Sequence, residues 1–176
     1  MLAYIFVIFA VLIRFVPHPW QFTPVAAALL FFGARGSRRQ LWLPLVFFAA
    51  SDLILNKFVY AYPFGWDQLV VWAWYAAILW LGTGLRDRQK PLPVIGAALV
   101  SSVSFFLISN FTVWAAGTMY PRNWAGLLTC YDAAVPFFHH TLEGDLIFTA
   151  AMFATPVALR VLAGATDKES DHTAAL

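Results

Sequence analysis

The chain has 176 residues, of which 61% are hydrophobic and 11% are charged, and its formal net charge is +2. A soluble domain carries about a quarter charged residues, so a soluble globular protein is excluded. The small net charge and the lack of a basic run give no indication of nucleic acid as a partner. The single cysteine, Cys130, excludes an intrachain disulfide. We predict an all-α integral membrane protein that contacts the lipid bilayer.

Apolar segments alternate with polar connections along the chain. A spanning helix needs about 20 residues, so the last three segments are long enough, whereas the first three must tilt little, thin the bilayer or border a cavity. The N-terminal segment lacks a basic region before it and a small-x-small cleavage site after it, which favours a retained helix over a signal peptide. In order, the six segments cover residues 2–16, 24–36, 41–55, 67–85, 92–116 and 142–163.

These segments predict a six-helix transmembrane bundle as one domain, residues 1–165. The remaining polar tail, residues 166–176, is expected to be disordered and cytoplasmic.

Basic residues are unevenly shared between the two sets of connections. One side has only Arg14, Lys57 and Arg122. By the positive-inside rule the richer side is cytoplasmic, which places both termini there, as an even number of spans requires. The eight basic residues on that side are Arg35, Arg38, Arg39, Arg86, Arg88, Lys90, Arg160 and Lys168.

The stretch PHPWQFTP, residues 17–24, separates the first two segments. Thr23 can cap a helix and Pro24 suits the first helical position. A helix from Pro24 to Gly36 has about 13 residues, or roughly 20 Å, which is shorter than the roughly 30 Å hydrocarbon core. We therefore expect Thr23 to lie below the outward surface, with its helix N-terminus facing an anionic or carbonyl group of a ligand. The alternative is a surface loop with an irregular turn at Trp20.

Four polar side chains interrupt or open the later apolar segments: Asp52, Asn110, Glu143 and Asp145. All four fall in the outward halves of their segments, which is what a solute cavity open to the outside requires. Structural alternatives exist for each. The two acids of the sixth segment could simply meet the positive end of a helix dipole. Asn110 could bond a neighbouring helix, and Asp52 could lie near the interface or bond a neighbour.

The connection from Gly117 to Thr141 is long enough for a structure of its own. Pro121 can open a helix and Pro136 can end it, with apolar residues at helical spacing between them. This pattern predicts an outward-side interfacial helix between spans five and six.

Three potential metal ligands follow in that region, His139, His140 and Glu143. They lack the spacing of a zinc protease, so we favour exposed histidines and predict no metal. The chain also lacks a GxSxG elbow, a Walker A sequence and GxGxxG. We therefore expect no catalytic residues, no cofactor and no ATP hydrolysis. An enzyme that uses Asp52, His18 or Glu143 as acid or base is the least favoured alternative.

Tryptophans and alanines each follow a pattern with two interpretations. Tryptophans near span ends are typical of a membrane interface, although those on the outward side could stack on a ring-shaped ligand. Alanines at every fourth position predict close packing within the bundle, or against a partner helix. The tryptophans are Trp20, Trp42, Trp66, Trp114 and Trp124, and the alanines are Ala73 with Ala77 and Ala150 with Ala154 and Ala158.

Longer motifs resemble a known family. The stretches are PHPWQFTPVAAALLFFGA, LPLVFFAASDLIL, ISNFTVWAAGTMYPRNWAGLLTCYDAAVPFF and TLEGDLIFTA. They are similar to a family of small uncharacterised bacterial membrane proteins described as transport proteins, which looks like the S components of energy-coupling-factor vitamin transporters. The resemblance covers residues 14–153 and implies a multi-pass protein of the bacterial inner membrane.

An S component binds a scarce micronutrient from the outside, while a separate membrane subunit and two ATPases supply energy. The resemblance therefore implies other membrane subunits as partners. Relatives carry Asn where this chain has Gln21, and Arg-Asn where it has His139-His140. The positions that match the family are His18, Thr23, Pro24, Ser51, Asp52, Asn110, Trp114, Tyr120, Pro121, Gly144 and Asp145.

Together these patterns predict a membrane transport protein that binds a small-molecule ligand from the outward side for uptake. The alternative is an accessory or structural subunit of a larger membrane complex. The residues predicted to bind the solute are His18, Trp20, Thr23, Asp52, Asn110, Trp114, Tyr120 and Asp145.

Overall fold

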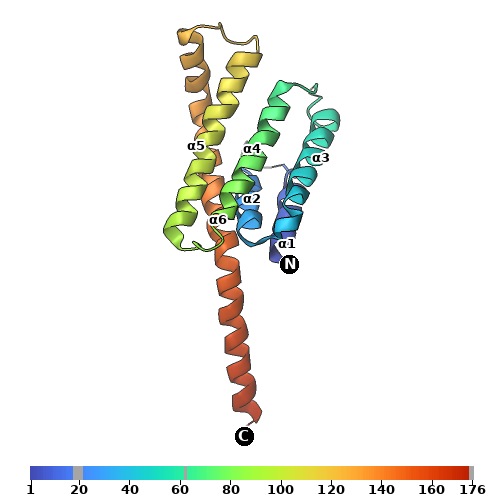
Figure 1. Cartoon of the computed structure of the whole chain (residues 1–176), viewed down its shortest axis with the longest axis vertical. Helices are drawn as coiled ribbons and strands as arrows, with labels where there is room; N and C mark the ends of the chain where they lie inside the picture. The colour runs from blue at the N-terminus through green and yellow to red at the C-terminus, as the bar shows by residue number, and fades with distance from the viewer. Residues whose placement is uncertain (18–21, 62, 175–176) are drawn as a thin grey trace.

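A computed structural model describes residues 1–17, 22–61 and 63–174, with side chains described as far as residue 164. The described residues form α-helices and one short 3-10 helix, without a β-strand, which confirms the predicted all-α class (Figure 1). The predicted site residues His18 and Trp20 lie outside the described residues. In chain order the elements are α1 (Leu2–Ile13), α2 (Val25–Arg35), η1 (Arg38–Gln40), α3 (Trp42–Phe58), α4 (Trp66–Thr83), α5 (Pro91–Ala116) and α6 (Trp124–Ala174).

Among the described residues, three helical stretches are long and apolar enough to cross a membrane: Arg38–Phe58, Pro91–Ala116 and Trp124–Gly164. The first of these was expected to be short, but η1 and the last turn of α3 lengthen it. α4, which was expected to be long enough, has 18 residues and is not among the three. α1 and α2 are short, as predicted, with 12 and 11 residues.

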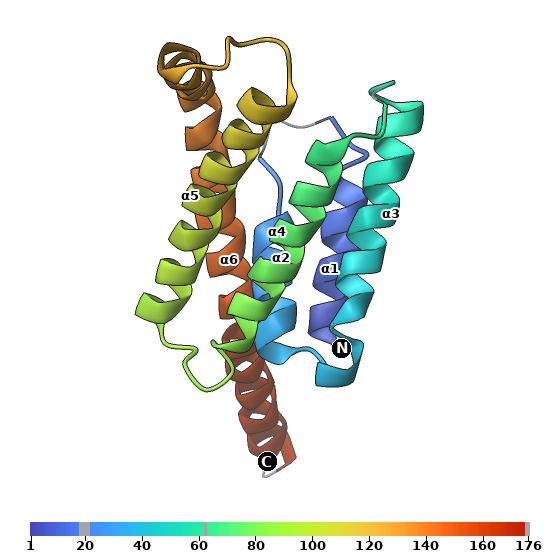
Figure 2. The same cartoon turned by 45° about the horizontal axis from the view of Figure 1, so that its top comes forward.

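α2 forms the centre of the bundle. Every residue from Val25 to Ala34 is buried, because α1, α4, α5 and α6 surround the helix (Figure 2). Edge-on ring contacts attach two neighbours to it, with 5.1 Å between the ring centroids of Tyr4 and Phe32 and 5.1 Å between those of Phe31 and Phe153. At about 1.5 Å per residue, α2 is only about 16 Å long. A helix this short begins inside the bundle rather than at its surface.

Two glycines allow α2 and α4 to touch backbone to backbone. A Cβ atom added to Gly33 would lie 2.3 Å from the carbonyl oxygen of Leu79, and one added to Gly82 would lie 2.5 Å from that of Leu30. Both glycines are buried. Small residues at a crossing point are typical of helix pairs that pack in membranes.

α6 is one helix, so the predicted separate interfacial helix is wrong. It begins at Trp124, where the Asn123 side chain accepts a hydrogen bond of 2.8 Å from the backbone N–H of Gly126, and it passes Pro136 without ending. Proline removes one backbone donor but leaves the turns on either side intact, and membrane helices tolerate this. The backbone continues as a helix to Ala174, through most of the segment for which a disordered tail is predicted.

The two ends of the bundle differ in charge. The α2–α3 and α4–α5 connections lie at one end, together with Met1, and α6 extends beyond that end (Figure 1). These connections contain Arg38, Arg39, Arg86, Arg88 and Lys90. The opposite end, called here the α5–α6 end, has the α3–α4 and α5–α6 connections.

The alanine stripes do not face the interior, contrary to the expectation of packing within the bundle. Ala73 and Ala77 on α4 are exposed, and so are Ala150, Ala154 and Ala158 on α6. Their small side chains leave flat strips on the outer surface.

Candidate functional site

A small cavity lies at the N-terminus of α2. Its volume is about 180 Å³, below the roughly 300–1,000 Å³ of sites for drug-sized ligands, so it suits a small solute. Figure 2 shows the start of α2 at mid-height of the bundle. This central cavity is lined by Arg14, Thr23, Val25, Ala26, Trp74, Tyr75, Phe105, Thr141 and Asp145.

Thr23 lies deep in the bundle, beside the middle of α6. A Cβ atom on Gly144 would lie 3.4 Å from the backbone nitrogen of Thr23, and Gly144 is about 30 Å along α6 from Trp124. The predicted cap at Thr23 is wrong, because α2 begins one residue later with Pro24 at its N-cap and without a side-chain cap. Thr23 lines the cavity instead.

The start of α2 faces the cavity directly, since Val25 and Ala26 line it. The first N–H groups of a helix have no partner within that helix, and they carry the positive end of its dipole. A carbonyl or carboxylate oxygen in the cavity could accept hydrogen bonds from these N–H groups and would be attracted by the positive end of the dipole.

Arg14 brings a positive charge to the wall of the cavity. It follows α1 directly, and its guanidinium donates to Ser51 at 2.5 Å and forms an ion pair with Asp52. The other oxygen of Asp52 accepts a hydrogen bond of 2.9 Å from Trp72 Nε1. Asp52, predicted to contact the solute, does not line the cavity itself. It binds the Arg14 guanidinium and holds it in place.

Asp145 is the acidic group that lines the cavity. It is 4% exposed, and its Oδ2 accepts a hydrogen bond of 2.7 Å from the Ser102 hydroxyl. Asp145 forms no ion pair with any described residue. One hydroxyl donor does not offset the loss of water around a carboxylate. Asp145 therefore requires either a proton or a positively charged group in the cavity.

Aromatic rings from α4 and α5 complete the wall. Trp74 and Phe105 lie with ring centroids 4.9 Å apart, and Trp74 Nε1 donates to the Ser104 hydroxyl at 3.0 Å. Tyr75 packs against Phe48, with 5.6 Å between centroids. These contacts hold the rings of Trp74 and Tyr75 in the wall of the cavity.

A second cavity of about 170 Å³, called here the side cavity, lies between α5 and α6. It contains two predicted site residues, Asn110 and Tyr120, together with Cys130. The Asn110 amide donates to the Phe106 carbonyl oxygen at 2.7 Å. Thr141 lines both the side cavity and the central cavity. The two cavities are thus neighbours that share one wall residue.

Two other candidates have structural contacts away from the central cavity. Trp114 Nε1 donates to the Pro121 carbonyl oxygen at 3.0 Å, which joins the end of α5 to the connection before α6. Glu143 is exposed and lies 4.0 Å from His140 Nδ1. Within the described ranges, no group of three or more His, Cys, Asp and Glu side chains could hold a metal ion.

Arg14 is the main residue that the sequence patterns missed as part of the site. The sequence patterns indicate only that Arg14 is one of three basic residues in the outward connections. A signal was present, because a carboxylate buried among apolar spans, such as Asp52, needs a cation nearby. Ser101 and Ser102 also stand within an apolar segment. Buried hydroxyl groups need hydrogen-bond partners, and Ser102 donates to Asp145.

The comparison with protein families matches residues 1–165 to DUF6580, a family of unknown function. The chain belongs to this family. Neither the curated proteins nor the solved structures contain a match.

Proposed function

We propose that this member of the DUF6580 family is a multi-pass protein of the bacterial inner membrane that binds a small solute from the outward side for uptake. In this proposal all six helices belong to the membrane-embedded bundle, and the basic connections and both termini are cytoplasmic. The α5–α6 end then faces outward, and the solute reaches the central cavity from there.

The central cavity is the observation that carries the proposal. It combines the Arg14 guanidinium and the N-terminus of α2 with the Asp145 carboxyl, all from different parts of the chain. Ionisable groups buried in a membrane bundle are costly and usually mark a solute or ion site. The solute that fits has a carboxylate or carbonyl oxygen for Arg14 and α2, and a cationic or hydrogen-bond donor group for Asp145. A flat apolar part would contact Trp74 and Phe105.

Energy for uptake would come from partners, as in the S components that the sequence resembles. The described helices offer a binding cavity, whereas the sequence has no phosphate-binding loop. We assign the chain no catalytic residue and no cofactor, and we expect a separate membrane subunit and two ATPases to associate with it.

Mass spectrometry of the purified protein tests the proposal. We expect wild-type protein in mild detergent to retain a stoichiometric small molecule, and Asp145→Asn to lower its retention at least about tenfold, because a hydrogen bond to a charged group contributes about 1.5–3 kcal/mol. Native spectra give the occupancy, and extraction followed by liquid chromatography identifies the molecule.

Glu143→Gln is the matched control, since it also neutralises an acid on α6 but its side chain is 59% exposed. It should retain the solute at the wild-type level. Equal retention in Asp145→Asn and wild type would contradict the assignment of the cavity as the site.

The exposed alanine stripes favour a second candidate, an accessory subunit of a larger membrane complex. Strips of small residues let a neighbouring helix approach closely, and Ala150, Ala154 and Ala158 form such a strip on α6. In that case the purified protein would hold stable large subunits and no small molecule.

A further inference from the structure

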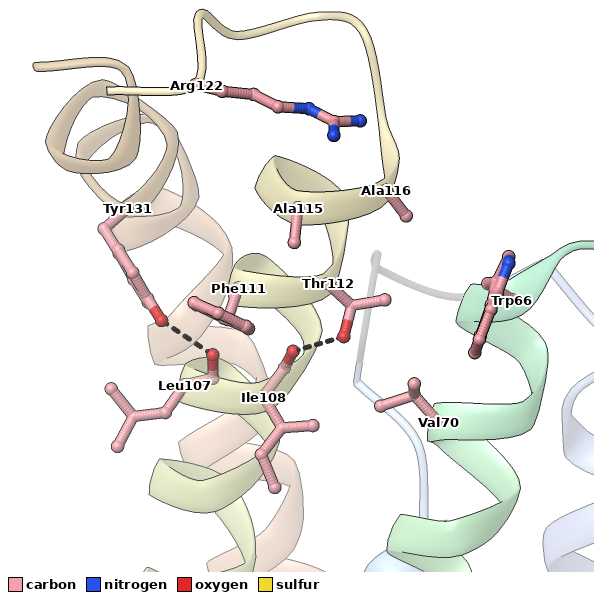
Figure 3. Close-up of a pocket in the computed structure, with 10 residues that line it drawn as sticks. All are labelled: Trp66, Val70, Leu107, Ile108, Phe111, Thr112, Ala115, Ala116, Arg122 and Tyr131. Atoms are coloured by element: carbon pink, nitrogen blue, oxygen red, sulfur yellow. Dashed lines mark hydrogen bonds between the residues drawn. The ribbon is translucent and has the colours of Figure 1, made fainter. Parts of the chain in front are cut away.

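A groove on the outer surface lies between the first half of α4 and the last turns of α5. Its volume is about 800 Å³, more than four times that of the central cavity. Figure 3 shows Trp66 and Val70 on the α4 side and Leu107 to Ala116 on the α5 side. This surface is called here the lateral groove. It shares no lining residue with the central cavity.

Apart from Arg122 and the Trp66 indole, both near the α5–α6 end, the walls of the lateral groove offer an occupant almost no free hydrogen-bonding groups. The Tyr131 hydroxyl donates to the Leu107 carbonyl oxygen at 2.7 Å, and the Thr112 hydroxyl donates to that of Ile108 at 2.8 Å (Figure 3). Both hydroxyl donors are thus used within the protein. A polar solute would lose its hydrogen bonds to water here without replacement, whereas a hydrocarbon chain would lose none.

The length of the lateral groove matches one leaflet of a bilayer. Leu107 and Ala116 are separated by about 14 Å along α5, and half of the roughly 30 Å hydrocarbon core is about 15 Å. The groove ends at the α5–α6 end of the bundle, beside the exposed ring of Trp66. Tryptophan in such a position is typical of the headgroup level. An acyl chain in the groove would therefore have its headgroup at the rim.

Arg122 supplies the charge at that rim. Figure 3 shows its side chain reaching from the α5–α6 connection over Ala115. It is the one charged residue among those described that line the groove, and it forms no ion pair within the described part of the chain. A guanidinium held at a headgroup level favours a phosphate, which it can contact through two N–H groups.

We propose that the lateral groove is a binding site for an anionic phospholipid, with an acyl chain between α4 and α5 and the headgroup phosphate on Arg122. The apolar walls, the length of one leaflet and the unpaired cation at the rim each support this occupant. A second copy of the chain is less suited to the groove. It would cover Arg122, and no acidic residue lines the groove to pair with this buried charge. This site is separate from the solute site, although it rests on the membrane placement of the bundle proposed above.

Competition between two lipids tests the site. The full chain in mild detergent is mixed with equal amounts of phosphatidylglycerol and phosphatidylcholine that have the same acyl chains, and bound lipids are counted by native mass spectrometry. We expect wild type to prefer phosphatidylglycerol about fivefold, because one arginine near a membrane surface contributes about 1 kcal/mol toward an anionic lipid. Arg122→Gln should remove this preference.

Lys57→Gln is the matched control, since Lys57 is also a cation at the α5–α6 end but does not line the groove. It should keep the fivefold preference.

Ala115→Trp fills the groove and should reduce retention of both lipids. The proposal is overturned if wild type holds both lipids equally, if Arg122→Gln keeps the preference, or if Ala115→Trp retains both lipids. A dimer that Ala115→Trp dissociates would also overturn it, by assigning the groove to a second copy.

Discussion

Replacement of Arg14 by methionine is expected to lower the free energy of unfolding by about 3–5 kcal/mol, the usual cost of removing one partner from a buried ion pair. Methionine keeps most of the side-chain volume, so the loss comes mainly from the charge. Asp52 would remain 4% exposed, with hydrogen bonds from Trp72 and Tyr75 but without its cation. Denaturant titration in detergent, followed by circular dichroism, measures the change.

A double variant separates the charge from the packing. Arg14→Met combined with Asp52→Asn removes both charges, so it should recover at least half of the loss seen in the single variant. Lys57→Met removes an exposed cation and should stay within about 0.5 kcal/mol of wild type. If Arg14→Met were as stable as Lys57→Met, the buried ion pair would not be important for the fold.

Gly33→Ala should be the second largest effect, with a loss of about 2–3 kcal/mol in the free energy of unfolding. A new methyl group at Gly33 would overlap the backbone of α4 near Leu79 and Gly82, and backbone cannot move aside as a side chain can. Overpacked cores typically lose about 1–3 kcal/mol. The same denaturant titration applies.

Gly96→Ala provides the control, because a Cβ atom there would meet nothing within 4 Å. Alanine is a better helix former than glycine by roughly 0.5–1 kcal/mol, so Gly96→Ala should stabilise the protein slightly. Opposite signs for the two glycine variants are the expected result. A stabilising Gly33→Ala would mean that α2 and α4 do not cross at this point.

The proposed solute site and the proposed lipid site differ in size, charge and position. The central cavity is small, is lined by residues of α2, α4, α5 and α6 together with Arg14 and Thr23, and contains charges of both signs. The lateral groove is large, apolar and has one cation at its rim. Loss of solute in Asp145→Asn with an unchanged lipid preference, and the reverse in Arg122→Gln, would assign each ligand to its own site.

Local sequence patterns were enough to predict the class of protein and the location of most helices. Apolar runs bounded by prolines, glycines and basic residues marked the helices to within a few residues, except at α6. There, Pro136 indicated a helix end, but packing against α5 allows the helix to continue. The run after Thr23 is too short to cross a bilayer, which agrees with the position of Thr23 beside the middle of α6.

The composition of the site depended on the tertiary structure. Sequence patterns singled out Asp52, Asp145 and Thr23, but their relation to Arg14 was not visible, because Arg14 and Asp52 are 38 positions apart. Hydrophobic periodicity reports which residues avoid water within one helix. It carries no information on which helices become neighbours. Apolar composition thus determined an all-α protein with helices long and apolar enough to cross a membrane, whereas the packing of distant helices decided that Arg14 meets Asp52 and lines the same cavity as Asp145.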